Sequence, residues 1–182
     1  MEKSYKLSKL KCSYEIVERK IKLPNCWIFN VKDDENSKYG RTGNAIYNHR
    51  MQDCFWGLRE VTEKGKRTAN VACLKAGDRV LFYLVGKDGH CFLGTCVLAS
   101  CFRKLEEKET GKFHREWLDW KEGVDLKRES IDEWREPLII HRLCGKVSFV
   151  PIGENYGSHL QGSVKKIDCN EYDIVVREHK MR

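Results

Sequence analysis

The sequence has no long hydrophobic run. No apolar stretch approaches the roughly 20 residues that a membrane-spanning helix needs, and the charged start Met1-Glu2-Lys3 lacks the apolar core of a signal peptide. The mean hydropathy is −0.61. These absences argue against a helical membrane protein and predict a soluble protein of the cytoplasm.

The motifs of common nucleotide-binding and hydrolytic enzymes are missing as well. The chain contains no Gly-x-x-x-x-Gly-Lys-Ser/Thr, no Gly-x-Gly-x-x-Gly, no Gly-x-Ser-x-Gly and no His-Glu-x-x-His. A Cys/His pair such as Cys54 with His49 stays open as an alternative, because catalytic partners can meet in space without a local signature. The sequence therefore favours a binding module that needs no cofactor over an enzyme.

Nine cysteines are present, but not in the pattern of a metal site or of a disulfide scaffold. Their number is odd, and no Cys-x-x-Cys or Cys-x-x-His pair occurs. Cys91, Cys96 and Cys101 lie five residues apart among apolar neighbours, where a thiol acts as a small buried hydrophobic group. We therefore expect the cysteines to fill strands, with no bound metal and no disulfide framework.

Length and charge define the organisation. The 182 residues are 41% hydrophobic, which suits one or at most two compact domains. Thirty-four Lys and Arg against 27 Asp and Glu give 34 − 27 = +7. More than half of this excess lies in the first 22 residues, so we predict a basic extension over residues 1–25, packed on or beside a domain over 26–182. The positive charge predicts an anionic partner.

Alternating and short apolar runs predict mainly strands. A buried strand is expected over residues 26–31, and an antiparallel pair over 74–83 and 91–102, joined by a turn rich in glycine. We further expect a loop over 32–47, strands over 137–143 and 146–152, and a helix over 171–178 capped by Asp168. Short strands with few peripheral helices predict an α+β fold with a small, curved or barrel-like mixed sheet, in which parallel βαβ winding is disfavoured.

The five tryptophans divide by their surroundings. Trp27 begins an apolar strand and Trp134 lies just before another, so both are expected in the core. Trp56 follows a polar loop, and Trp120 has polar neighbours on both sides. The polar neighbours of Trp120 argue against its complete burial, and packing and ligand contact are both open for Trp56 and Trp120.

Five motifs follow one another in a characteristic order. They are Trp-Ile-Phe from Trp27, Phe-Trp-Gly-Leu from Phe55, Leu-Lys-x-Gly-Asp-x-Val-x-Phe-Tyr from Leu74, Phe-Leu-Gly from Phe92 and Trp-Lys-x-Gly-Val-Asp-Leu from Trp120. In this order the chain resembles the EVE domain, a member of the PUA-like superfamily that includes YTH domains. The resemblance covers about residues 26–178 and implies a barrel-like sheet with short flanking helices.

The resemblance also implies a reader of a modified base. Trp56 and Trp120 match the aromatic cage that surrounds a flipped base, although the glycine after Trp120 is displaced by one position. The expected base-binding residues are Trp56, Trp120, Asn30, Lys32, Asp33 and Gly57, and the expected phosphate contacts are Arg50, Arg59, Lys64, Lys66 and Arg67. Stacking returns about 1–3 kcal/mol per base against the few kcal/mol that flipping costs, so two indoles and a few polar groups suffice.

The class of nucleic acid is less closely defined. EVE-like domains resemble both readers of RNA modification and the DNA-recognition domains of McrB-type restriction subunits. We expect modified DNA, with methylated adenine or cytosine, and a possible place within a larger protein. An RNA reader of the N6-methyladenine type, a nucleic-acid-processing enzyme that uses Cys54, and a module that binds an acidic protein are the alternatives.

Overall fold

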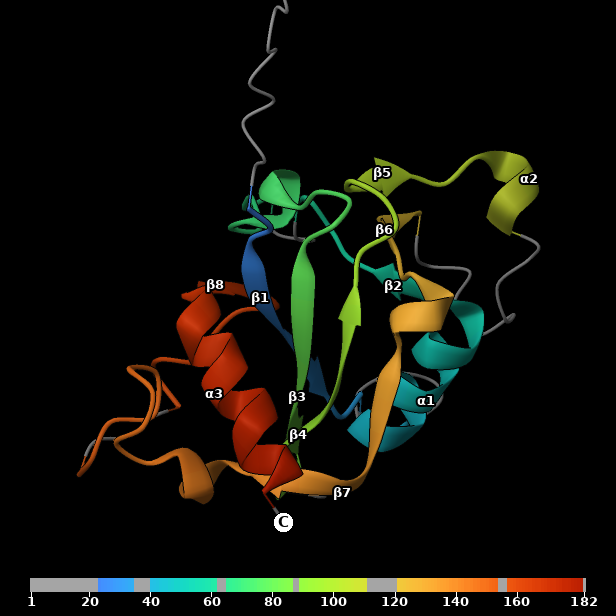
Figure 1. The fold of residues 1–182 in the computed structure, drawn as a ribbon. Coiled ribbons are helices and arrows are strands. Elements are labelled where there is room, and N and C mark those ends of the chain that lie inside the picture. The colour runs from blue at the N-terminus through green and yellow to red at the C-terminus, as the bar shows by residue number, and fades with distance from the viewer. Residues whose placement is uncertain are drawn as a thin grey trace, which may run out of the picture.

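The chain folds around two β-sheets (Figure 1). The computed structural model describes residues 23–34, 40–61, 65–86, 89–110, 121–153 and 157–181. The strands are β1 Cys26–Lys32, β2 Phe55–Gly57, β3 Arg79–Gly86, β4 Gly89–Val97, β5 Arg103–Lys104, β6 Glu122–Asp125, β7 Asp132–Ile139 and β8 Val164–Ile167. The helices are α1 Gly43–Asp53, α2 Glu107–Thr110 and α3 Cys169–Lys180, with 3-10 turns η1 Val71–Cys73, η3 Arg128–Ser130 and η4 Ile140–Leu143. The larger sheet has the order β7-β4-β3-β1-β8 and the smaller one β2-β6-β5.

Strand β1 lies inside the larger sheet and is buried on both faces. Trp27, Phe29 and Val31 enter one hydrophobic cluster with residues of α1 and of the smaller sheet. Cys26 and Ile28 enter a second cluster with residues of α3. Since successive side chains of a strand point to opposite faces, β1 separates two cores, and α1 and α3 cover opposite faces of the sheet. The expected burial of Trp27 is confirmed.

The predicted hairpin is present, and it has a parallel neighbour. Strands β3 and β4 pair antiparallel up to Gly86 with Gly89. Strand β1, however, runs parallel to β3 along its whole length. This pair corrects the expectation that parallel winding is disfavoured, because α1 and β2 lie between β1 and β3 in the chain and supply the crossover that parallel neighbours need. The α+β class with a mixed sheet is confirmed.

Helix α1 corrects the loop expected over residues 32–47. The helix begins at Gly43, and the Thr42 side-chain oxygen accepts a hydrogen bond from the Ala45 N–H at 3.3 Å. Threonine is a favoured N-cap residue because it satisfies an amide that the helix leaves without a partner. The many polar residues of this stretch therefore include a helix start and not only a loop.

The strands expected over 137–143 and 146–152 are also corrected. Strand β7 ends at Ile139, and the chain continues through η4 and turns. The buried residues after β7 are Ile140, Leu143, Val147, Phe149 and Val150. The intervals of three and four residues from Ile140 to Val147 are typical of helical turns, not of the alternation that a half-buried strand needs.

The C-terminal helix is confirmed. Helix α3 spans Cys169–Lys180, and the Asp168 carboxylate caps it by accepting from the Asn170 N–H at 2.7 Å. Tyr172 and Val175 face the second core. The imidazole of His179 stacks on Trp134 at 4.0 Å between ring centres, and Trp134 is buried as expected.

A disulfide joins Cys26 at the start of β1 to Cys169 at the start of α3. It corrects the expectation that no cysteines pair, since residues 143 positions apart gave no local signal. Cys91 and Cys96 are buried in β4 as expected, whereas Cys101 is exposed because β4 ends at Val97. Across the described ranges, no group of three or more His, Cys, Asp and Glu side chains could hold a metal ion.

Membrane-spanning helices and the predicted basic extension are the two remaining points. Among the described residues, no helix is long and apolar enough to cross a membrane. The predicted basic extension lies outside the described residues as far as residue 22, so the division into residues 1–25 and 26–182 stays a prediction.

Candidate nucleic-acid interface

Trp56 is held at the centre of strand β2, directly after helix α1. Cys54 ends that helix in the left-handed conformation, with φ of 52°, and turns the chain into β2. The Trp56 indole lies 4.7 Å from the Phe82 ring and 5.7 Å from the Phe29 ring, measured between centroids. Its exposed fraction is 1%. Packing and ligand contact were both open for Trp56 from the sequence, and the structure shows a packed ring over which the two sheets close.

The side chain of Arg50 covers the indole of Trp56. The guanidinium carbon lies 4.3 Å from the ring centroid, a cation–π distance. Arg50 is 8% exposed, so this predicted phosphate contact does not stand on the surface. Burial, and then the positive charge of Arg41, lower the pKa of Arg50 to about 9. Arg41, which no sequence motif indicated, therefore belongs to the same positively charged group.

Trp120 lies outside the described residues, but the strands beside it are described. Strand β6 pairs with β2, with Trp56 opposite Val124. The Leu105 N–H donates to the Lys121 carbonyl oxygen at 2.7 Å. The two ends of the segment that carries Trp120 are thus joined beside the β5–β6 pair, and β6 lies between β5 and β2, the strand that carries Trp56.

Arg103 forms hydrogen bonds that hold the strands at the ends of this segment in position. Its guanidinium donates to both oxygens of Asp125 on β6, at 2.7 and 2.8 Å, and to both oxygens of Glu109 in α2, at 2.8 and 3.0 Å. These charge-assisted hydrogen bonds raise the pKa of Arg103 above its usual range. Bidentate pairs of this kind fix orientation as well as distance. Arg103 therefore sets the position of β6 relative to α2.

Gly123 is the glycine of the Trp-Lys-x-Gly-Val-Asp-Leu motif, and the structure leaves no room for a side chain at this position. It faces Gly57 across the β2–β6 pair. A Cβ atom at residue 123 would lie 2.3 Å from the Trp56 carbonyl oxygen and 3.0 Å from the Gly57 Cα. Gly57 and Gly123 together let the two strands approach closely, and this approach holds the backbone of Trp56.

We expect Gly123→Ala to lower the free energy of unfolding by about 1–3 kcal/mol, because the added methyl group overpacks the strand pair against backbone atoms that cannot rotate away. Urea denaturation measures the change. Gly65→Ala is the comparison, because a Cβ there meets nothing within 4 Å and only the positive φ of 74° is strained. Gly123→Ala with wild-type stability would show that β2 and β6 separate freely.

Asn30 lies on the opposite face of the larger sheet from Trp56. Its side-chain amide donates to the carbonyl oxygens of Leu160 and Gly162, at 2.5 and 2.6 Å. Asn30 is 9% exposed and occupies the same face of β1 as Ile28. The structure therefore does not bring Asn30 together with Trp56 in one pocket.

Strand β1 ends at Lys32, and Asp33 follows it near the start of α1. Lys32 is exposed. The Asp33 carboxylate accepts a hydrogen bond from the Gly43 N–H at 2.7 Å, at the N-terminus of α1. A carboxylate there is stabilised by the helix dipole. Asp33 thus has a structural contact that its assignment to a base edge did not anticipate.

The predicted basic residues after β2 form a loop. The Thr68 N–H donates to the Glu60 carbonyl oxygen at 2.7 Å, and Val61 pairs with Arg67, so residues 60–68 fold back on themselves. Arg59 is half-buried, and Lys66 and Arg67 are exposed. We call Arg59, Lys66 and Arg67 the basic loop; Lys64 lies outside the described residues. This loop continues directly from the strand that carries Trp56.

Cys54 and His49, the alternative Cys/His pair, both belong to helix α1 and its C-terminal end. The Cys54 thiol donates weak hydrogen bonds to the carbonyl oxygens of Met51 at 3.5 Å and Gln52 at 4.0 Å. These contacts belong to the end of helix α1. His49 lies within the same helix, and it is half-buried.

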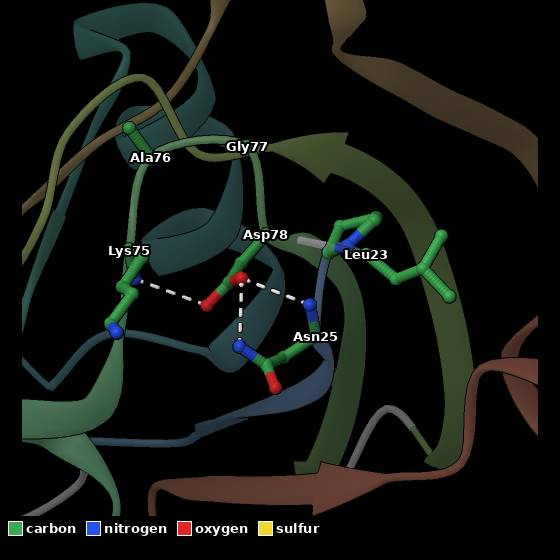
Figure 2. Close-up of a pocket in the computed structure, with 7 residues that line it drawn as sticks. Leu23, Asn25, Lys75, Ala76, Gly77 and Asp78 are labelled. Carbon is green, nitrogen blue, oxygen red and sulfur yellow. Dashed lines mark hydrogen bonds between the residues drawn. The ribbon is translucent and has the colours of Figure 1, made fainter. Parts of the chain in front are cut away.

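Asp78 is a buried carboxylate that its sequence motif indicates only as part of a turn. It is 2% exposed and forms the floor of a pocket of about 260 Å³ (Figure 2). One oxygen accepts from the backbone and side-chain amides of Asn25, at 3.0 and 3.1 Å. The other accepts from the Trp27 indole at 2.8 Å and the Lys75 N–H at 3.1 Å. Because both oxygens already accept from the protein, Asp78 stabilises the fold and not a ligand.

Comparisons with known proteins place the fold. No family model matches the chain, and no curated protein matches it. Among solved structures, a hypothetical protein from Leishmania major has a TM-score of 0.55 at 17% identity, covering 87% of this chain and 96% of that one. A protein from Rhodopseudomonas palustris has a TM-score of 0.55 at 12% identity, covering 86% and 94%. Human THYN1, solved in complex with DNA that contains 5-methylcytosine, has a TM-score of 0.53 at 13% identity, covering 86% and 98%. At these identities the likeness shows the fold alone, which is the mixed α+β fold described above.

Proposed function

We propose that this protein is a non-enzymatic reader of modified nucleic acid, which binds DNA in preference to RNA and stacks a flipped, methylated base on Trp56. The observation that carries the proposal is that the guanidinium of Arg50, and not an apolar side chain, lies on the face of the Trp56 indole. An aromatic face that accepts a flat cation also suits a flat base. The fold shared with human THYN1, solved with 5-methylcytosine DNA, supports the same assignment.

Charge supports the choice of a nucleic acid. In the basic loop, Arg59 follows Trp56 by three residues, and Lys66 and Arg67, further along the chain, are exposed. Cations beside a stacking aromatic are the usual arrangement for holding phosphates near a bound base. Trp120 is proposed as the second aromatic contact, since its segment leads into β6, which pairs with β2 at Trp56. A place in a modification-dependent restriction protein stays a prediction from the sequence resemblance.

A binding panel tests the proposal. Fluorescence anisotropy measures the affinity for oligonucleotides with 5-methylcytosine, N6-methyladenine or no modification, each as DNA and as RNA. We expect one methylated DNA to bind most tightly, about 4-fold better than its unmethylated form, because a buried methyl group contributes about 0.8 kcal/mol. The affinity should fall steeply with salt, with a slope that reports the phosphates contacted. Equal affinity for all six oligonucleotides would contradict the proposal, and preference for a methylated RNA would reverse the choice of DNA.

Variants of two tryptophans localise the site. We expect Trp56→Leu to weaken binding of the preferred oligonucleotide by about 5- to 150-fold, the range of one lost stacking contact. Trp134→Leu is the matched control, since Trp134 is also buried but lies in the other core, and its affinity should be unchanged. Circular dichroism verifies folding, and Trp56→Phe replaces Trp56→Leu if that variant unfolds. Equal losses in both variants would remove Trp56 from the site.

A further inference from the structure

Lys166 is an exposed cation on β8, the strand at one edge of the larger sheet. Its ammonium nitrogen lies 5.8 Å from the centre of the Trp27 ring, a cation–π distance. That ring is held in place, because Trp27 is 1% exposed and its indole N–H donates to Asp78 at 2.8 Å. The ammonium group of Lys166 therefore has a defined position above a fixed ring, although it lies at the surface.

The surroundings of Lys166 differ from those of other cations in the protein. Arg79 forms an ion pair with Asp173 of α3. Lys146 forms one with Glu178 at 2.6 Å. Among the described residues no carboxylate pairs with Lys166, and the aromatic ring beneath it does not neutralise its charge. The positive charge of Lys166 therefore stays available to an anion from outside the protein.

The end of the basic loop is attached to the same strand. The side-chain amide of Asn70, three residues after Arg67, donates to the Val164 carbonyl oxygen of β8 at 3.2 Å. Val164 and Lys166 are two residues apart, so they share the face of the sheet that carries Trp27. A chain extends by at most about 3.6 Å per residue, which places Arg67 within about 11 Å of Asn70. The basic loop and Lys166 therefore lie at the same edge of the sheet.

Trp56 lies over the same face. Its ring is 5.7 Å from the Phe29 ring, and Phe29 pairs with Val164 across β1 and β8. Trp27 pairs with Lys166 in the same register. The Trp56 ring and the Lys166 ammonium group thus lie next to neighbouring residue pairs on one face of the β1–β8 strand pair.

We propose that Lys166 is a phosphate contact, which continues the phosphate-binding surface of the basic loop across the β8 edge of the sheet. The same DNA backbone can pass both Arg67 and Lys166 within one helical turn of about 34 Å. A lysine has three donors on a long stem and binds a phosphate as a point charge. The inference rests on the nucleic-acid part of the proposed function, and it does not depend on a base that stacks on Trp56.

Lys166→Gln tests the proposal, and Lys165→Gln is its matched control. The two lysines are adjacent in the chain, but Lys165 points to the opposite face of β8, where its ammonium group donates to the His159 carbonyl oxygen. Fluorescence anisotropy measures binding of the full chain to a DNA duplex with 5-methylcytosine between 50 and 200 mM salt. We expect Lys166→Gln to lower the log–log salt slope by about 0.9, which is one phosphate. Its loss of affinity should thus be about 3.5-fold greater at 50 mM than at 200 mM salt.

The slope of Lys165→Gln should equal that of the wild type. The loss in Lys166→Gln should be the same for the methylated and the unmethylated duplex, because a phosphate contact carries no information about the base.

Lys166→Arg separates charge from packing. It keeps a cation over Trp27, so its salt slope should match that of the wild type. Urea denaturation of Lys166→Gln should give the wild-type midpoint. A lower midpoint together with an unchanged salt slope would assign Lys166 to the stability of the fold and overturn the phosphate contact.

The outcomes separate this inference from the proposed function. Equal slopes for Lys166→Gln and Lys165→Gln, with a wild type that binds the methylated duplex preferentially, would overturn the phosphate contact and leave the reader intact. A lower slope in Lys166→Gln, with a wild type that does not distinguish methylated from unmethylated DNA, would support the phosphate contact and overturn the reader. No binding of any oligonucleotide by the wild type would overturn both.

Discussion

Replacing Asp78 by Asn should lower the free energy of unfolding by about 3–5 kcal/mol, although the two side chains have nearly the same shape. Each carboxylate oxygen of Asp78 accepts two hydrogen bonds, from Asn25 on one side and from Trp27 and Lys75 on the other. An asparagine has one acceptor oxygen and one amide group that only donates. Either orientation of the substituted amide therefore points N–H groups at N–H groups in a buried site.

Urea denaturation measures this loss as a lower midpoint with an unchanged m-value. Asp168→Asn is the matched control. Asp168 is exposed and accepts one hydrogen bond as the N-cap of α3, where Asn serves as well as Asp, so its change should stay below about 0.5 kcal/mol. Equal effects of the two substitutions would mean that the contacts of Asp78 do not stabilise the fold.

Removing the Cys26–Cys169 disulfide should lower the free energy of unfolding by about 2–5 kcal/mol under oxidising conditions. The bond closes a loop of 143 residues, and a cross-link over so long a loop strongly restricts the unfolded chain. Cys169→Ala breaks the bond at its half-buried end and leaves Cys26 in the core.

Guanidinium denaturation with and without a reductant provides the measurement. With a reductant present, the wild type and Cys169→Ala should become nearly equally stable, because neither then has the cross-link. Cys73→Ala, which removes an exposed free thiol, should change nothing in either condition. A difference between the wild type and Cys169→Ala that persists in reductant would assign the effect to side-chain packing instead.

Local patterns predicted the elements whose signals are local. The β3–β4 hairpin follows from apolar runs on either side of a turn, and α3 follows from Asp168 and an apolar stripe. Strand β1 was predicted from its short run of apolar residues, and the structure shows that this run is buried on both faces. The N-cap signal of α1 at Thr42 is also local, but the glycine and asparagine residues around it are typical of a loop, so the helix was not predicted.

The arrangement of the site could not be predicted, since it depends on contacts between distant elements. Asn30 and Phe29 are neighbours in the chain, yet the strand directs them to opposite cores. Arg50 was assigned to the surface because nothing in its local sequence indicates that two sheets close over Trp56. The four donors to Asp78 include residues more than 50 positions away.

The hydrogen bond between Leu105 and Lys121 has a consequence for how such a protein can diverge. Because this bond joins the two ends of the segment, the residues between them form an insertion between paired strands. The free-energy cost of closing a loop rises only by about 0.6 kcal/mol for each doubling of its length. Insertions between Glu109, which Arg103 holds, and Lys121 can thus accumulate at little cost to the two sheets. The pairing separates a stretch whose length can change from the sheets that must keep their shape.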